Sequence, residues 1–153
     1  MKKFTFALKP VLDQRERIED ERAQALAARQ RELTLAQDEL ARLNAEFRRH
    51  TTTLREDHRE FTSEQLRLHY AHLDFLDRAI TAQERVVATR RAEFERAREL
   101  LVDASKDRKA IEKLQTRKYE QFVALESRLE QRDADDANER RYSRAQQAPG
   151  GLS

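Results

Sequence analysis

Two histidines near the middle of this sequence have the clearest chemical potential. His69 and His72 are three positions apart, and Asp74 and Asp77 follow closely. Residues at this spacing share one face of a helix, and imidazole and carboxylate groups both bind transition metals. Helical zinc motifs, however, usually place two histidines four positions apart and take a third ligand from elsewhere. We therefore predict ordinary solvated or half-buried histidines and no metal site.

Residues for catalysis or cofactor binding are equally sparse. The only glycines are Gly150 and Gly151, and the chain has no cysteine. A phosphate-cradling loop needs glycines ahead of a helix, and thiolate chemistry needs cysteine, so neither is available. Carboxylates are abundant enough to form close pairs by chance, and a thin helical chain has no concave pocket to shift their pKa values. The sequence predicts a protein that is not an enzyme, with no catalytic residue and no cofactor.

The most basic stretch covers residues 106–118, where six basic side chains accompany two acidic ones. It fits a solvated helix face, or a surface that docks into an acidic groove of a partner protein, since clustered charge steers association. Nucleic acid is a weaker reading because the net charge of the whole chain is only +2 and elements for reading bases are missing. We predict no nucleic-acid partner and leave the other two readings open.

The elements that position these residues follow from composition. No glycine or proline occurs between Pro10 and Pro149, and 39% of the residues are charged, well above the roughly 25% of ordinary domains. Such a chain has too little apolar material for a thick core, but paired helices need only about two apolar residues in seven. No apolar run approaches the roughly 18 residues of a membrane-spanning helix, so we expect only peripheral membrane association, through partners.

Apolar residues recur every seven positions in two separate series, as is typical of paired helices. The first is Leu12, Leu26, Leu33, Leu40, Phe47, Leu54 and Phe61, interrupted by Glu19, and the second is Leu66, Leu73, Ile80, Val87, Phe94 and Leu101. We predict an all-α fold in which two long helices form an antiparallel coiled-coil hairpin. With the two series level across the turn, Phe47 faces Ile80 and Leu40 faces Val87.

The hairpin turn is predicted near residues 58–66, because Thr62 and Gln65 have capping-box spacing for a new helix. We expect one hairpin domain over residues 1–132, monomeric when free. Residues 133–153 are expected to form a disordered tail, since few apolar residues hold them down. The alternative is one continuous helix of about 130 residues that assembles as a parallel dimer and serves as a passive spacer or scaffold.

Three segments resemble the FliJ family of bacterial flagellar type III export, which is related to stalk-like proteins of virulence secretion systems. Residues 4–15 resemble the family's opening, Phe-x-Phe-x-Leu followed by an apolar pair and an arginine. Residues 104–117 resemble its Asp-Arg-Lys-x-x-Glu-Lys-Leu signature with a further arginine, and residues 70–83 resemble the start of its second helix. The resemblance covers about residues 4–130 and leaves the tail aside.

The resemblance implies a cytoplasmic stalk-like coiled coil that inserts into the hexameric export ATPase ring, FliI. It further implies that the protein promotes assembly and activity of this ring and couples it to the membrane export gate FlhA. Export chaperones are additional implied partners, and the implied location is the cytoplasm and the cytoplasmic side of the cell membrane.

Two sets of site residues follow from combining the resemblance with the apolar and basic patterns. For ATPase binding they are Phe6, Leu8, Val11, Leu12, Arg15, Arg108, Lys109, Lys113, Leu114, Arg117 and Lys118. For export-gate binding they are Leu73, Leu76, Ala79, Ile80 and Gln83. Among the gate residues, Leu73 and Ile80 belong to the second apolar series, so Leu76 and Ala79 are the stronger candidates for partner contact.

Overall fold

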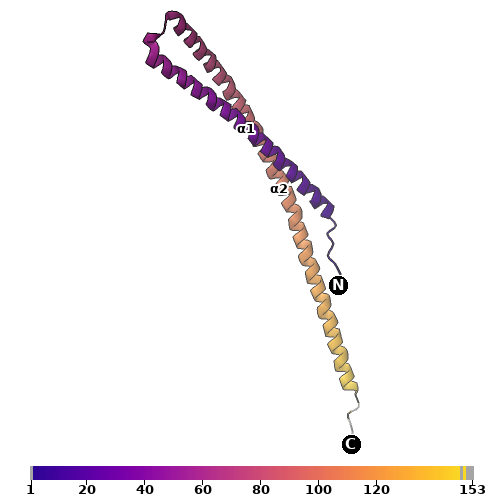
Figure 1. The fold of residues 1–153 in the computed structure, drawn as a ribbon. Helices are drawn as coiled ribbons and strands as arrows, with labels where there is room; N and C mark the ends of the chain where they lie inside the picture. Colours follow the sequence, from indigo (N-terminus) through magenta and orange to yellow (C-terminus); the bar gives the residue numbers. More distant parts are fainter. Residues whose placement is uncertain (1, 149, 151–153) are drawn as a thin grey trace. The chain divides into compact units, whose positions relative to one another are not determined.

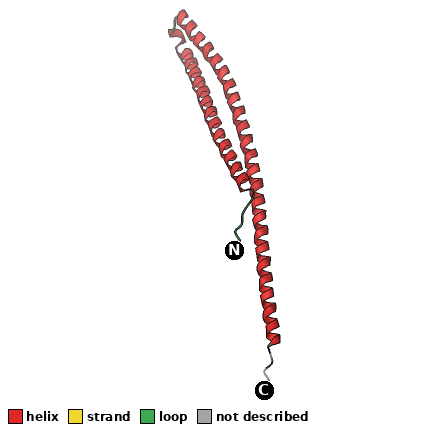
Figure 2. Cartoon of the chain, turned by 90° about the vertical axis from the view of Figure 1, so that its right-hand side faces the viewer, coloured by secondary structure: helices red, strands yellow, loops and turns green. Residues whose placement is uncertain are grey.

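A computed structural model describes residues 2–148 and 150, and over these residues the chain is helical with no strand. The order of elements is α1 (Lys9–Asp57), the short 3-10 helix η1 (His58–Glu60) and α2 (Ser63–Gln147) (Figure 1). Loop is confined to the segment before α1, the turn and the end of the chain (Figure 2). The prediction of an all-α protein with two long helices is confirmed.

The chain divides into two compact units, whereas the sequence predicted one domain over residues 1–132. Unit 1 combines Met1–Arg15 with Asp107–Ser153, and unit 2 is Glu16–Lys106. The expectation of a tail that is disordered from residue 133 differs from the structure, in which α2 continues to Gln147. This stretch contains several alanine, arginine and glutamine residues and has no glycine or proline before Pro149, which permits a helix. Residues 149 and 151–153 of the predicted tail lie outside the described part of the chain.

The start of α1 follows from Pro10, which lies in the first turn. A proline there costs no hydrogen bond, because the first amides of a helix have no partner within it. The amide of Lys9 donates to the carbonyl of Phe6 at 3.1 Å, and that of Leu12 donates to Leu8 at 2.9 Å. The segment before the helix is thus tied to its first turn.

The turn between the helices is built without any positive φ angle at the described non-glycine residues. Phe61 is extended, with φ −89° and ψ 138°, and redirects the chain after η1. The backbone N–H of Thr62 then donates to the side chain of Gln65 at 2.9 Å, and the N–H of Gln65 donates to the Thr62 hydroxyl at 3.2 Å. These two reciprocal bonds are the predicted capping box, which is confirmed.

Unit 2 is an antiparallel helical hairpin, because its contacts pair later residues of α1 with earlier residues of α2. The side chain of Gln83 donates to the carbonyl of Ala36 at 3.0 Å, and the rings of His50 and His72 lie 4.3 Å apart. The antiparallel hairpin is therefore confirmed, and the continuous-helix alternative is wrong for this chain.

The core of unit 2 is a narrow seam of leucines and alanines. On α1 its buried members are Leu33, Ala36, Leu43 and Leu54. On α2 they are Leu76, Ala97 and Ala104. These α2 positions belong to a sevenfold series that also contains Gln83 and Arg90, three residues after the apolar series seen in the sequence. The seam therefore lies between two series, of which one carries polar residues.

The predicted register of the hairpin is wrong. With Phe47 opposite Ile80, Gln83 would face Asn44, but its side chain reaches Ala36, about two helical turns away. The apolar series defines a face for each helix, but it leaves the axial offset open, because apolar side chains pack against any apolar neighbour. Polar residues of the seam series mark the offset that the structure adopts, since Gln83 donates to the Ala36 carbonyl and Arg90 contacts Glu32.

Within residues 2–148 and 150, no helix has the length and apolar character needed to cross a membrane.

Candidate partner-docking sites

In unit 1 the N-terminal segment packs along α2 through aromatic contacts. The ring of Phe4 meets that of Tyr119 edge-on, with centroids 5.3 Å apart, and lies 5.6 Å from the ring of Phe122. Leu12 is the best buried residue of this unit, at 3% exposure, and Arg15 forms an ion pair with Asp107 at 3.6 Å. The structure thus brings together the two segments that the sequence assigned to ATPase binding.

These two segments enclose an apolar groove with a basic edge. Its walls are Lys3, Phe4, Thr5, Phe6, Ala7 and Leu8 from the segment before α1, and Leu114, Lys118 and Phe122 from α2. Four of the predicted ATPase-binding residues therefore line it, namely Phe6, Leu8, Leu114 and Lys118. Its lining is aromatic and aliphatic with charged ends, which suits an apolar side chain presented by a partner near carboxylates.

The basic residues predicted to bind the ATPase differ in how far their side chains are exposed to solvent. Arg108 is largely covered, with a side chain 22% exposed, and donates to Glu112 at 2.7 Å. Lys109, Lys113 and Arg117 are exposed and line a shallow groove along one face of α2. Arg108 is therefore largely covered and paired with Glu112, whereas the other three face solvent.

The residues predicted for the export gate all lie in unit 2, but they do not share one exposed surface. Leu76 is only 1% exposed and is the largest fully buried side chain, and Gln83 is committed to the Ala36 carbonyl. Leu73, Ala79 and Ile80 are half-buried. Leu76 therefore packs in the hairpin core and is not available as a partner contact, contrary to the expectation from the sequence.

Sequence reasoning missed a largely exposed apolar stripe on α2 that runs beside the seam. Leu68 is 68% exposed, Phe75 65% and Val86 41%, Ala82 is also exposed, and the half-buried Ala79 lies along the same stripe. These positions follow one another at intervals of seven, four, three and four residues, which places them on one face of the helix. The signal was present in the sequence, but the stronger sevenfold series through Leu73 and Ile80 concealed it.

Four charged residues of unit 2 join α1 to α2 in a closed ring of ion pairs. Arg29 contacts Glu32 at 3.0 Å and Glu93 at 3.3 Å, and Arg90 contacts Glu93 at 3.1 Å and Glu32 at 3.5 Å. The hydrogen bond to Glu32 and the charges of both glutamates raise the pKa of the Arg29 guanidinium. This ring, the Gln83 hydrogen bond and the contact between His72 and Glu46 are polar contacts that join the two helices at the observed register.

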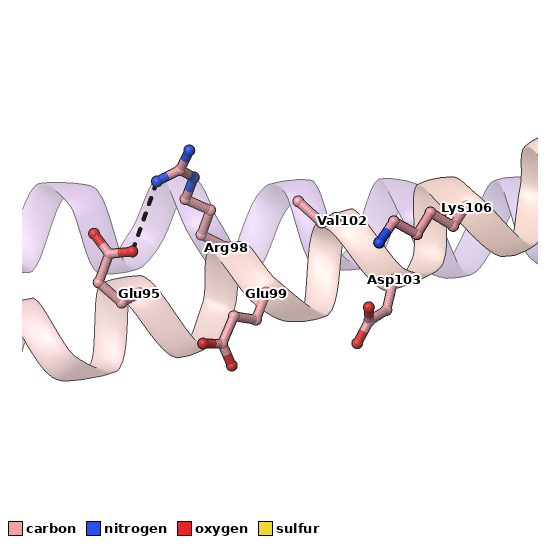
Figure 3. Close-up of a pocket in the computed structure, with 6 residues that line it drawn as sticks. All are labelled: Glu95, Arg98, Glu99, Val102, Asp103 and Lys106. Atoms are coloured by element: carbon pink, nitrogen blue, oxygen red, sulfur yellow. Dashed lines mark ion pairs between the residues drawn. The ribbon is translucent and has the colours of Figure 1, made fainter.

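A further groove lies along α2 in unit 2 and has no catalytic character. It is lined by Glu95, Arg98, Glu99, Val102, Asp103 and Lys106 (Figure 3). All six side chains belong to one helix and are exposed, and Figure 3 shows the ion pair between Glu95 and Arg98, at 3.7 Å. A row of solvated charges on one helix cannot exclude water from a substrate.

In the structure His72 is grouped with His50, whereas the sequence spacing had singled out His72 together with His69. His72 from α2 lies beside His50 and Glu46 from α1, and ligand atoms of these three residues lie within 4.8 Å of one another. His69 points elsewhere, with its ring 4.6 Å from that of Phe61 and 6.3 Å from that of His50. The pair singled out in the sequence, His69 and His72, is therefore not the pair that the fold assembles.

Together, the two long helices and the short turn that joins them define an α-helical coiled-coil hairpin protein. A family model described as "Flagellar FliJ protein" matches residues 4–147. The chain belongs to the FliJ family and is a component of flagellar type III export.

Comparison with solved structures supports the fold. The chain is similar to a putative YscO homolog, CT670, from Chlamydia trachomatis, with 18% sequence identity and a TM-score of 0.67. The match covers 95% of this chain and 99% of the other. No curated protein matches the sequence significantly.

Proposed function

We propose that this chain is the stalk of the flagellar export ATPase complex. In this proposal unit 1 enters the hexameric, FliI-like ATPase ring, promotes its assembly and raises its activity. The observation that carries the proposal is the groove of unit 1, in which residues 3–8 and α2 form an apolar slot edged by lysines. Family membership supplies the context, and the groove supplies a surface that a second protein can bind.

The chemistry of unit 1 suits contact with several similar subunits. Apolar anchors in a pocket supply most of the binding energy of an interface, whereas exposed charges mainly steer and orient the partner. In this proposal the groove receives an apolar side chain of one ring subunit, and the exposed Lys109, Lys113 and Arg117 attract acidic surfaces without locking to one geometry. A short apolar slot beside exposed basic side chains would therefore permit exchange between neighbouring subunits of a ring.

We further propose that unit 2 couples the ATPase to the FlhA-like export gate through the exposed stripe of α2. Leu68, Phe75 and Val86 are apolar and solvent-exposed, which is costly unless a partner covers them. Of the residues first assigned to the gate, Ala79 belongs to this stripe. Leu73, Leu76, Ile80 and Gln83 lie on the seam side, where they hold the helix that presents the stripe.

The proposal places the protein in the cytoplasm and at the cytoplasmic side of the membrane, bound there through the export apparatus. Export chaperones are proposed as further partners on the strength of the family alone. The second candidate function, a passive coiled-coil scaffold, predicts that the chain binds partners without changing ATPase activity.

An ATPase assay with charge-reversed variants tests the ATPase part of the proposal. Purified export ATPase is assayed alone, with the wild-type chain and with the double variant Lys113→Glu/Arg117→Glu. A matched control, Arg85→Glu/Arg91→Glu, makes the same charge change at exposed positions of α2 in unit 2. We expect stimulation by the wild-type chain and the control, and loss of stimulation with the unit 1 variant. Equal stimulation by both variants would reject the basic face of α2 in unit 1 as a docking surface, and no stimulation by any chain would favour the scaffold.

A binding assay tests the gate part. The cytoplasmic region of the gate protein is titrated with the wild-type chain, with Phe75→Asp and with Leu35→Asp. Phe75 and Leu35 are similarly exposed, at 65% and 69%, but only Phe75 lies on the stripe. We expect Phe75→Asp to weaken binding and Leu35→Asp to leave it unchanged; the reverse pattern would move the gate surface to α1.

A further inference from the structure

We propose that Glu46, His50 and His72 form a binding site for a divalent transition-metal cation, with Zn²⁺ as its ligand, that clips α1 to α2 near the turn. The inference is independent of the stalk proposal, because it concerns unit 2 alone. It rests on the convergence of two imidazoles and one carboxylate from two helices, with all three ligand atoms within 4.8 Å of one another.

The spacing along α1 is the first argument. Glu46 and His50 are four residues apart, so successive turns of the helix present both side chains on the same face. This is the spacing by which helical zinc motifs place two ligands, and it is the spacing that His69 and His72 lack. The third ligand, His72, comes from the facing helix, as such motifs require.

The orientation of the carboxylate is the second argument. One oxygen of Glu46, Oε2, is held by Arg42 Nη1 at 3.2 Å, and the other, Oε1, lies 3.5 Å from His72 Nε2. A guanidinium that holds the outer oxygen fixes the carboxylate and leaves the inner oxygen directed at the imidazole. Groups around a metal site commonly orient its ligands in this way.

The third argument is the partial burial of the cluster, which leaves it accessible to a cation while its ligands are held by neighbouring side chains. The side chains of His72 and Glu46 are 36% and 26% exposed, and His50 is half-buried. Bonds of about 2.0–2.2 Å from zinc to nitrogen and oxygen would require the three ligand atoms to move closer together, which small side-chain rotations provide. Two histidines and one glutamate leave a fourth tetrahedral position for water.

The position of His50 on the seam means that metal binding would affect the packing of the two helices. His50 falls in the sevenfold series of Ala36 and Leu43, so it takes the place of an apolar core residue. A metal bound there would replace apolar packing with coordination bonds that cross the two helices. Because only the folded hairpin brings the ligands together, zinc binding stabilises the fold in proportion to its saturation.

The test uses the full chain without a histidine tag. Zinc binding is measured by calorimetric titration, cobalt substitution reports tetrahedral coordination by its visible absorption, and thermal unfolding is followed with zinc and with chelator. The variants are His50→Gln and His72→Gln, and the control is His58→Gln, which removes an exposed histidine of η1 outside the cluster.

We expect one zinc per chain, and a rise in Tm of about 5–10 °C when zinc is present at roughly 100 times Kd. Loss of a direct ligand should weaken zinc affinity by more than the roughly 10- to 100-fold typical of changes around a site. The His58→Gln variant should bind like the wild type.

Four results would overturn the proposal. They are the absence of zinc binding, undiminished binding in His50→Gln or His72→Gln, equal weakening in the His58→Gln control, and a stoichiometry of one zinc per two chains. The circular dichroism of each variant without zinc shows whether the hairpin still forms. Because His72 lies at the edge of the seam, His72→Gln remains a valid test even if His50→Gln unfolds.

Discussion

Replacing Leu76 with alanine is expected to destabilise the hairpin of unit 2 more than any other single leucine truncation on α2. Leu76 is 1% exposed and has the largest fully buried side chain of the described residues. The same substitution at Leu68, eight positions earlier on α2 and 68% exposed, removes the same atoms from a solvated site. The two variants therefore form a matched pair that differs in burial.

The size of the effect follows from the width of the seam. Buried leucine-to-alanine changes cost about 2–5 kcal/mol, of which part is lost burial and part is the cavity that remains. Two helices bury a narrow interface whose edges reach water, so the gap at position 76 closes more easily than in a globular core. We expect the free energy of unfolding to fall by about 2–3 kcal/mol for Leu76→Ala, and by less than about 0.5 kcal/mol for Leu68→Ala.

Urea unfolding followed by circular dichroism measures both values, and the gate-binding assay adds a second readout. Leu76→Ala should lose stability and retain gate affinity under conditions where it is folded, whereas Leu68→Ala should keep its stability and weaken gate binding. Equal destabilisation by the two changes would refute the assignment of Leu76 to the seam. Loss of gate binding by folded Leu76→Ala would restore Leu76 as a partner contact.

Three further predictions concern local interactions. Thr62→Ala removes half of the capping box and should lower stability by about 0.5–2 kcal/mol in urea unfolding; an unchanged midpoint would show that α2 starts without this cap. A double-mutant cycle on Glu32 and Arg90 should give a coupling of about 0.2–1 kcal/mol that shrinks in high salt, and a coupling insensitive to salt would contradict an exposed ion pair. Phe4→Ala should release the segment before α1 from Tyr119 and Phe122 and speed its cleavage by protease, relative to Thr5→Ala; equal cleavage would mean that the ring contacts do not hold it.

Much of the fold could be predicted because it depends on local chemistry. The long stretch without glycine or proline specifies helix, and the sevenfold apolar series specifies pairing. The capping box at Thr62 and Gln65 specifies where the second helix starts. Once a hairpin with that turn is given, its geometry brings the start of the chain to the stretch around Leu114.

The parts that could not be predicted depend on polar residues at the interface. A search for apolar periodicity omits Gln83 and Arg90, although both lie on the seam series of Leu76 and Ala97. It also omits His50, for the same reason. These long or polar side chains reach partners on the facing helix, and their reach cannot be inferred from the spacing of leucines. The register, and with it the exposed face of α2, was therefore assigned wrongly.

The sequence by itself determined that this chain is helical, where it turns, that it folds back on itself and to which family it belongs. The helices and the position of the turn arise from interactions between residues close in the chain, and the energies of these interactions do not depend on the partner helix. Tertiary structure alone decided the axial offset of the helices, the burial of Leu76 behind the exposed Phe75, and the meeting of Glu46 and His50 with His72. Each of these depends on which side chains of α1 and α2 come level, and a displacement by one or two turns changes every such pairing while the apolar contacts remain nearly as favourable.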